Sequence, residues 1–385
     1  MGLIMNYLWF LFMFLPYDND AFIDRKLFVF DPENFKENNV TLSVFADEIQ
    51  YIPLDNKIPV GLIYKFEITE TSIFLSSKDI GILKFDRTGR NPVRIGSIGN
   101  GPGEYIYPMN FAVEPSSGTV CLNDKGNKIK IYTETGKYQK EFTFNNIAGS
   151  IDNIGFFNTS IFIYYFMQFG DAENLWLFSD KKGDIISVKK RNIPYFTSNW
   201  ITGGGSYIFD NCLHYWNPYC DTVFKITTGF KTEPGFLFAV GEHRFPQAPI
   251  IPDERLKKMF SLNRLCETEE YRVFSYYYNY RMSLLLVGKS NDKYLLKSWQ
   301  QSDIPGIPND LDGGLPFEFT GYYKEKDNEY LTGIIYPDKL KAHVKTDAFR
   351  KKVVKSPTKR SELIDFADSL NDTDNPIIVL LRMKK

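Results

Sequence analysis

The segment Phe85-Asp86-Arg87-Thr88-Gly89 is the first of four similar segments that recur along the chain. Each segment follows an alternating apolar run, begins with an aromatic residue, continues with a short and mainly polar stretch, and ends with a glycine. The other three are Tyr132–Gly136, Phe178–Gly183 and Phe224–Gly229, so the aromatic residues are spaced by 47, 46 and 46 positions. A fixed period of this length is typical of an array of repeated supersecondary units.

Residues 110–142 show the repeat most clearly. Short apolar runs at 110–114, 119–123, 128–132 and 137–142 are separated by turns that contain Gly, Asn, Asp or Pro. Alternation with period two, bounded by such residues, predicts antiparallel strands joined by tight turns. Four antiparallel strands in a repeat of this length describe one blade of a β-propeller.

The same template fits six times, which predicts an all-β, six-bladed β-propeller of four-stranded antiparallel blades. The predicted blades occupy about 60–96, 97–145, 147–190, 192–240, 263–300 and 316–385. The last blade lacks one strand, and an early apolar strand at about 40–54 has no place in blade one. Pairing this strand with 376–385 would close the ring and remove an exposed sheet edge. We therefore predict that 21–385 form a single propeller domain.

Two insertions between strands have helical periodicity. The first follows a proline and spans Asp253 to about Leu262. In the second, Ser361 is predicted to cap a helix that repeats apolar residues at Leu363, Phe366, Ala367 and Leu370. Propeller connectivity places both insertions on one face of the ring. This face is therefore the predicted functional face.

The composition limits the classes of function. A net charge of −1 provides no global field for nucleic acid or an anionic membrane, so no nucleic-acid partner is expected. Four cysteines are too few for a disulfide scaffold in 385 residues. The only Cys/His cluster, Cys212, His214 and Cys220, is predicted to pack in the core, and the alternative is a zinc site that would need a fourth ligand. No cofactor, metal site or catalytic residue is predicted.

The N-terminus predicts export. Leu3 to Leu15 is almost wholly apolar, and the chain turns polar at Pro16. Thirteen residues are too few to span a bilayer but suit the core of a signal peptide, so 1–20 is interpreted as a signal-like segment and the protein as periplasmic or cell-surface. No Lys or Arg precedes the run and no small-residue cleavage site follows it, so a buried N-terminal segment is the alternative. Without a nearby cysteine to carry a lipid, membrane association stays open.

The turn Gly101-Pro102-Gly103-Glu104-Tyr105, followed by Pro108 and by Asp124 to Ile129, resembles the NHL-type propeller repeat. From about residue 40 onward, the chain is similar to the uncharacterised NHL/TolB-like six-bladed propeller proteins of Bacteroidetes, many of which are lipoproteins. The resemblance implies the fold and assigns no activity. The missing lipid-attachment cysteine departs from the family pattern.

Loops on the predicted functional face combine charged side chains with tyrosines. The candidate ligand-binding residues are Glu104, Tyr105, Asp124, Asn127, Asn217, Tyr219, Arg281 and Asp312. Such loops around a central depression suit a glycan, a peptide or a surface protein, which predicts a non-enzymatic binding or interaction propeller. The alternative is a glycan hydrolase or lyase, which needs two carboxylates facing each other across the channel. Glu104 with Asp124 or Asp312 are the first candidates for that pair.

Overall fold

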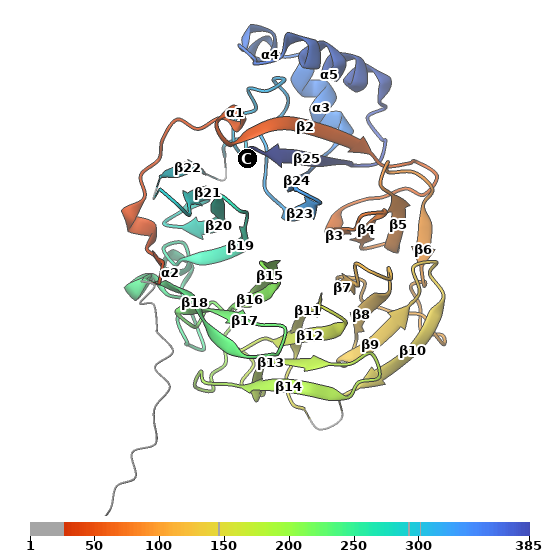
Figure 1. The fold of residues 1–385 in the computed structure, drawn as a ribbon, viewed down its shortest axis with the longest axis vertical. Helices are drawn as coiled ribbons and strands as arrows, with labels where there is room; N and C mark the ends of the chain where they lie inside the picture. The colour runs from red at the N-terminus through yellow and green to blue at the C-terminus, as the bar shows by residue number, and fades with distance from the viewer. Residues whose placement is uncertain (1–26, 145–146, 292, 301) are drawn as a thin grey trace, which may run out of the picture.

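The computed structural model describes residues 27–144, 147–291, 293–300 and 302–385. These residues form six antiparallel sheets around a central axis (Figure 1). Five sheets have four strands, and the sheet of blade four has a fifth. The chain is thus an all-β, six-bladed β-propeller, as the repeat predicts. The apolar run at 3–15 and the rest of the signal-like segment lie outside the described residues.

In blades one to five, four consecutive strands run from the channel outward, and in blade six β2 takes the outermost place (Figure 1). Blades one and two comprise β3 (Ile63–Ile68), β4 (Ser72–Ser77), β5 (Gly81–Asp86) and β6 (Val93–Ile95), then β7 (Asn110–Val113), β8 (Val120–Asp124), β9 (Lys128–Tyr132) and β10 (Tyr138–Thr143). Blades three and four comprise β11 (Ile151–Phe157), β12 (Ser160–Tyr165), β13 (Asn174–Ser179) and β14 (Ile185–Lys190), then β15 (Gly205–Phe209), β16 (Cys212–Trp216), β17 (Thr222–Ile226) and β18 (Thr232–Phe238). Blade five comprises β19 (Ser261–Glu267), β20 (Tyr271–Tyr278), β21 (Arg281–Gly288) and β22 (Tyr294–Trp299), and blade six comprises β23 (Gly321–Glu325), β24 (Asn328–Ile335), β25 (Ile377–Met383) and β2 (Ala46–Pro53).

The repeated segments form the turns between the third and fourth strands. Gly89 and Gly136 have φ of 78° and 86°, in the left-handed region that favours glycine. A Cβ added at Gly136 would lie 2.0 Å from the Arg94 carbonyl oxygen in the outer strand of the preceding blade. In blades one and two the repeated glycine thus lies against the backbone of the preceding blade, because a Cβ at Gly89 would likewise lie 2.3 Å from the Pro53 carbonyl oxygen. In blade four the left-handed residue is Phe230, with φ of 62°, and not the predicted Gly229.

The core lies between neighbouring blades. Every residue of the middle strands β4, β12, β13 and β16 is buried, whereas no residue of the outer strand β14 is buried. The Trp176 ring of blade three lies 5.0 Å from Tyr215 and 5.2 Å from Phe224 of blade four, measured between ring centroids. Such aromatic pairs contribute about 0.5–1.5 kcal/mol each beyond the area that they bury. Packing of this kind joins successive blades into one ring.

Strands from both ends of the chain close the ring, as predicted. β2 pairs antiparallel with β25, from Pro53 opposite Ile377 to Ala46 opposite Met383. The early strand is shorter than predicted, because Leu42–Phe45 form one helical turn, α1. Leu42 and Phe45 are three positions apart, so they would point to opposite faces of a strand, whereas the helical turn lets both side chains reach the core.

A segment before β2 runs along the outside of the ring, and the sequence does not predict it. β1 (Val29–Phe30) pairs parallel with β18 of blade four. The chain then passes blade five, where the Asn38 amide nitrogen donates to the Leu296 carbonyl oxygen over 3.1 Å and the Asn38 side chain accepts from the Leu296 amide. It reaches blade six at α1. Residues 29–45, which we call the strap, thus contact three successive blades (Figure 1).

Both predicted insertions contain helices, with different bounds. α2 covers only Asp253–Leu256, and Leu262 lies in β19. The second insertion holds three helices, α3 (Pro337–Val344), α4 (Asp347–Lys351) and α5 (Pro357–Ser369). Ser356, and not the predicted Ser361, caps α5 by accepting from the Lys359 amide. Figure 1 shows α3–α5 outside β2, at the rim of the ring.

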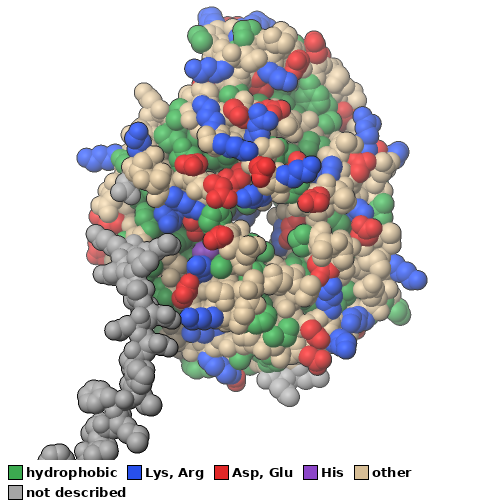
Figure 2. Space-filling model, in the orientation of Figure 1, with side chains coloured by type: hydrophobic (Ala, Val, Ile, Leu, Met, Phe, Trp, Pro, Cys, Tyr) green, Lys and Arg blue, Asp and Glu red, His purple; other side chains and the backbone are tan. Residues whose placement is uncertain are grey.

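Propeller connectivity divides the loops between two faces. The loops that join successive blades and the turns between second and third strands open on one face, which we call the entry face. The insertions also open there, and α2 contacts the β20–β21 turn through a 2.9 Å hydrogen bond from the Tyr280 hydroxyl to Glu254. A space-filling view along the ring axis shows a hollow at the centre, surrounded by acidic and basic side chains (Figure 2). The helices therefore leave the central channel open.

Candidate functional site

Three predicted site residues, Glu104, Tyr105 and Asp124, lie close together at the junction of blades one and two. Tyr105 is fully buried; its hydroxyl accepts from the Ile82 amide over 2.8 Å and donates to the Ile95 carbonyl over 2.9 Å. Burial raises the pKa of Tyr105 to about 12, so the hydroxyl stays protonated. Asp124 is buried in an ion pair with Lys130, at 2.9 Å, and Lys130 also donates to the Glu104 carbonyl oxygen. These contacts fasten two blades together.

Asn127, Asn217 and Tyr219 also have intramolecular partners. The Asn127 side chain accepts from the Ile151 amide over 3.1 Å and so links blade two to blade three. The buried Asn217 accepts from the Tyr219 amide over 3.0 Å and donates to Tyr215. Tyr219 is buried beneath Phe196, with ring centroids 4.7 Å apart. These side chains shape loops on the entry face without projecting from it.

Arg281 and Asp312 lie in different surroundings. Arg281 pairs with Glu37 of the strap at 3.0 Å. Asp312 is buried and accepts from the Tyr51 hydroxyl over 2.9 Å and from the Asn309 side chain over 2.6 Å. Burial raises the pKa of Asp312, while these hydrogen bonds act against the increase. Asp312 is therefore held by side chains of blade six, whereas Glu104, its candidate catalytic partner, lies at the junction of blades one and two. Asp124, the other candidate partner of Glu104, is already paired with Lys130.

Asp152, on the innermost strand of blade three, is a channel carboxyl that the sequence analysis does not single out. Its Oδ2 accepts from the Gly204 amide over 2.7 Å. A Cβ added at Gly203 would lie 2.7 Å from Oδ1, so a larger residue there would displace the carboxyl group. Burial raises the pKa of Asp152 to about 7, and the hydrogen bond from Gly204 lowers it only in part. A channel carboxyl that titrates near neutrality marks a candidate functional site.

Replacement of Asp152 by asparagine is expected to alter the pH dependence of stability. The folded-state pKa lies above the ordinary value of 3.8, so the contribution of Asp152 to stability falls as the pH rises from about 4 to about 7. Asp152→Asn should therefore be more stable than the wild type at pH 8, by ~1–2 kcal/mol after allowance for solvent in the channel, and should lose this advantage near pH 4. Urea unfolding at both values measures the difference. The exposed Asp171→Asn is the control, and an equal effect at both values would exclude titration of Asp152.

A pocket opens beside the channel between blades five and six. It has a volume of about 340 Å³, and its lining includes Arg264 from β19 and Glu318 from the loop that precedes β23. The Arg264 side chain is exposed to solvent, but protein atoms lie close enough to remove part of its hydration. This desolvation lowers the pKa of Arg264, while the nearby charge of Glu318 acts against the decrease. Asp152, Gly204, Arg264 and Glu318 lie near the beginnings of β11, β15, β19 and β23, the innermost strands of blades three to six, which all begin at the entry face. We call this region the channel mouth.

Apolar side chains are exposed together on the entry face over blades three and four. The group comprises Phe169 (37% exposed), Tyr195 (64%), Trp200 (45%), Ile201 (59%) and Ile250 (76%), and we call it the apolar patch. Its loops contact one another, because the Asn199 amide donates to the Pro249 carbonyl over 2.9 Å and the Asn199 side chain accepts from the Ile251 amide. A Cβ at Gly170 would lie 3.3 Å from the Phe196 carbonyl oxygen, which places the loop of Phe169 beside the same segment.

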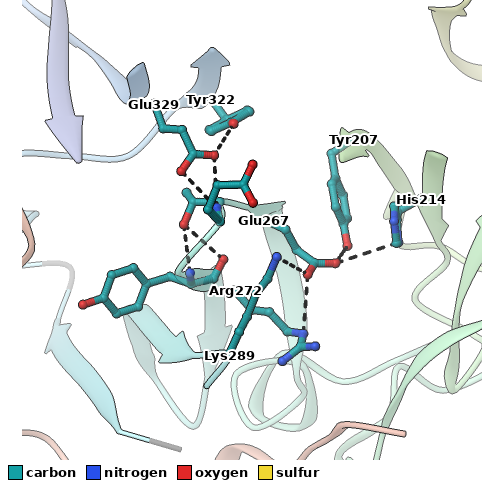
Figure 3. A network of polar contacts seen from close by, with 10 residues as sticks. Tyr207, His214, Glu267, Arg272, Lys289, Tyr322 and Glu329 are labelled. Carbon is teal, nitrogen blue, oxygen red and sulfur yellow. Dashed lines mark hydrogen bonds and ion pairs between the residues drawn. The ribbon is translucent and has the colours of Figure 1, made fainter. Parts of the chain in front are cut away.

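A polar network lies at the opposite face, between blades four and five (Figure 3). The buried Glu267 accepts from the Tyr207 hydroxyl over 2.8 Å and pairs with Lys289 at 2.9 Å. Burial raises the pKa of Glu267, but the charge and hydrogen bond of Lys289, together with the hydrogen bond from Tyr207, outweigh burial and hold that pKa below its usual value. His214 lies 4.0 Å from Glu267, and burial lowers its pKa to about 4, so it is neutral at pH 7. Because the Glu267 carboxylate is already paired with Lys289 and Tyr207, we interpret this network as a structural link between blades four and five.

Two further properties concern possible partners. Within the described residues, no helix is long and apolar enough to cross a membrane. The same ranges contain no group of three or more His, Cys, Asp or Glu side chains arranged to hold a metal ion. Cys212 and His214 are buried in β16, and Cys220 is partly buried.

Comparisons with known proteins identify the fold and the family. A family model described as "Domain of unknown function (DUF4934)" matches residues 27–382. A solved structure of a Bacteroides fragilis NCTC 9343 protein described as exported has a TM-score of 0.67 and 18% identity, and the match covers 93% of this chain and 99% of that one. A duf4221-family protein from Bacteroides vulgatus ATCC 8482 has a TM-score of 0.52 and 9% identity, over 88% and 98%. No curated protein matches the sequence. At these identities, the similarity to solved structures shows the propeller fold alone.

Proposed function

The chain belongs to the family of unknown function DUF4934, and we propose that it is a non-enzymatic propeller that binds a protein partner through the apolar patch on its entry face. The observation that carries this proposal is the exposure of five large apolar side chains on contacting loops. Monomeric proteins rarely expose contiguous apolar surface of this kind unless it binds something. The helices α3–α5 lie at the rim outside β2 and away from blades three and four, so they do not cover the patch (Figure 1).

The composition of the patch favours a polypeptide over a glycan. Aromatic residues and arginine are enriched at protein interfaces, where they provide most of the binding energy. The Arg191 guanidinium lies 4.6 Å from the centre of the Tyr195 ring and donates to the Ile193 carbonyl over 2.6 Å. Ile201 and Ile250 add branched aliphatic surface, which packs against apolar side chains but offers a sugar ring neither stacking nor hydrogen bonds.

The patch is held in a defined arrangement before binding. Phe196 packs on the buried Tyr219, and Tyr219 packs edge-on against Phe245 at 6.2 Å. Arg191 also donates to the Ala172 carbonyl over 3.2 Å, which joins the segment after β14 to blade three. Such preorganisation reduces the entropy lost on binding. Tyr219, predicted as a ligand-binding residue, would in this proposal support the patch from below.

We extend the proposal to an exported protein that works at the cell surface or in the periplasm. The support is the signal-like sequence of residues 3–15 and the description of the Bacteroides fragilis protein as exported. Partners in that compartment include surface proteins and secreted peptides. Fractionation of the native host tests the location, and recovery of the chain in the cytoplasm alone would contradict it.

Selection of peptides tests the binding proposal. A phage-displayed peptide library is selected against the immobilised chain, and the affinity of selected peptides is measured by fluorescence polarisation. We expect apolar peptides whose affinity falls by about tenfold to a hundredfold in Trp200→Ser with Ile250→Ser, because loss of a central aromatic contact costs roughly 2 kcal/mol or more.

The matched control is Ile186→Ser with Val188→Ser, which removes exposed apolar side chains from the outer strand of blade three. This variant should bind the selected peptides as the wild type does. Equal binding by both double variants would contradict the proposal. A glycan array that gives specific binding while the peptide selection gives none would assign the face to a glycan instead.

A further inference from the structure

The pocket between blades five and six contains two opposite charges that do not neutralise each other directly. Arg264 and Glu318 both line it, and Glu318 contributes to the electrostatic surroundings of Arg264. Among the described residues, however, neither side chain forms an ion pair within 4 Å or a side-chain hydrogen bond. Each charge is therefore available to a group that enters between them.

Part of the pocket lining is apolar. Met282 is partly buried, and Trp299 and Phe319 are 7% and 6% exposed, while Ser275 and Thr320 add hydroxyl groups to the same lining. The Asn263 side chain, beside Arg264 on β19, adds an amide to the lining and donates a weak hydrogen bond to the Met282 sulfur over 3.8 Å. The pocket thus combines a cation, an anion, an amide and two hydroxyl groups with a smaller apolar part of its lining. The volume of about 340 Å³ lies at the lower end of the roughly 300–1,000 Å³ of small-molecule sites.

We propose that this pocket binds a free α-amino acid with an apolar side chain. In this arrangement the ligand carboxylate accepts from Arg264, and its ammonium group donates to Glu318. Both are charge-assisted hydrogen bonds, which are stronger than neutral ones. The side chain of the ligand packs against Met282, Trp299 and Phe319, where burial of apolar area stabilises the complex.

The specificity follows from what each analogue leaves unpaired. A ligand without the ammonium group leaves the Glu318 carboxylate without a cationic partner. A ligand without the carboxylate leaves the Arg264 guanidinium without an anionic partner. A charged group that loses water without gaining a partner weakens binding more than a lost apolar contact does. A neutral sugar would satisfy neither charge, which is why the proposal names a zwitterion.

Calorimetric titration of the full chain tests the proposal with L-leucine and L-phenylalanine as probes. The comparison ligands are 4-methylpentanoate, which lacks the amine, leucinamide, which lacks the carboxylate, and glycine, which lacks the apolar side chain. We expect at least one of the two amino acids to bind, and each comparison ligand to bind about tenfold more weakly or worse.

Two variants assign the contacts. Arg264→Gln should bind leucine and leucinamide with equal affinity, because the guanidinium that distinguishes them is gone. Glu318→Gln should likewise no longer distinguish leucine from 4-methylpentanoate. Arg94→Gln and Glu70→Gln, on other blades, are the controls and should keep both preferences. Both pocket residues are solvent-exposed, so thermal unfolding of the variants should match the wild type.

The amino-acid proposal does not depend on the apolar patch, which lies over blades three and four. Trp200→Ser with Ile250→Ser should leave leucine binding unchanged, and Arg264→Gln should leave binding of the selected peptides unchanged. Failure of one proposal can therefore be told from failure of the other. The amino-acid proposal is overturned if neither probe binds, if an analogue that lacks one charge binds as well as leucine, or if both pocket variants bind leucine as the wild type does.

Discussion

Removal of residues 377–385 is expected to abolish the cooperative unfolding transition. β25 lies between β24 and β2 and hydrogen-bonds to both. Six of its seven residues are buried, namely Ile377, Ile378, Val379, Leu380, Leu381 and Met383. At about 1.5–3 kcal/mol for each buried apolar side chain, the loss reaches roughly 10 kcal/mol, which matches the total stability of a typical protein, about 5–15 kcal/mol.

Near-ultraviolet circular dichroism and scanning calorimetry measure the effect of this truncation. The control removes Lys385 alone, which is exposed and lies beyond β25. A truncated chain that unfolds at the wild-type temperature would show that the strands from the two ends do not hold the ring together. Leu381→Ala gives a graded version of the test, with an expected cost of about 2–5 kcal/mol for a fully buried leucine.

Glu267→Ala is expected to destabilise the protein by about 3–5 kcal/mol, the usual cost of removing one partner from a buried ion pair. The change leaves Lys289 without the carboxylate that pairs with it at 2.9 Å, and it leaves the Tyr207 hydroxyl without its acceptor (Figure 3). Because the pKa of Glu267 is lowered in the folded state, its contribution to stability is present at neutral pH and is lost as the pH falls below the ordinary carboxyl range.

The neighbouring Glu269→Ala provides a matched control for Glu267→Ala. Glu269 pairs with Lys324 at 2.8 Å, but its side chain is 64% exposed. An exposed ion pair of this kind contributes at most about 1 kcal/mol. Guanidinium unfolding of both variants at pH 7 measures the difference, and similar losses for the two would contradict the role given to Glu267.

The sequence predicts the fold because the repeat reflects a local requirement that recurs in the ring. Gly89 and Gly136 must adopt left-handed backbone and lie against the preceding blade, so the residue type and the period are both constrained. The strap carries no such signal. β1 is two residues long, and its position depends on β18, which lies about 200 residues later, so no local pattern announces it.

The channel mouth is harder to predict than the fold. The same difficulty affects Tyr105 and Asp124, which lie beside turns and are therefore predicted to be exposed. In the structure both side chains are buried and take part in contacts at the junction of two blades. Asp152 and Arg264 lie inside strands, where a polar residue is usually interpreted as part of a solvated sheet face. Which residues of an innermost strand face the channel depends on its register and twist, and a single sequence does not determine these.

The strap has a consequence for how the molecule is presented to its surroundings. Phe28 accepts a hydrogen bond from Leu237 in the outermost strand of blade four, so the described chain enters the ring from its side and not from either face. Any tether joined ahead of Leu27 would therefore hold the disc by its edge. Attachment at the edge would leave both faces of the ring, including the apolar patch, free of the attachment point.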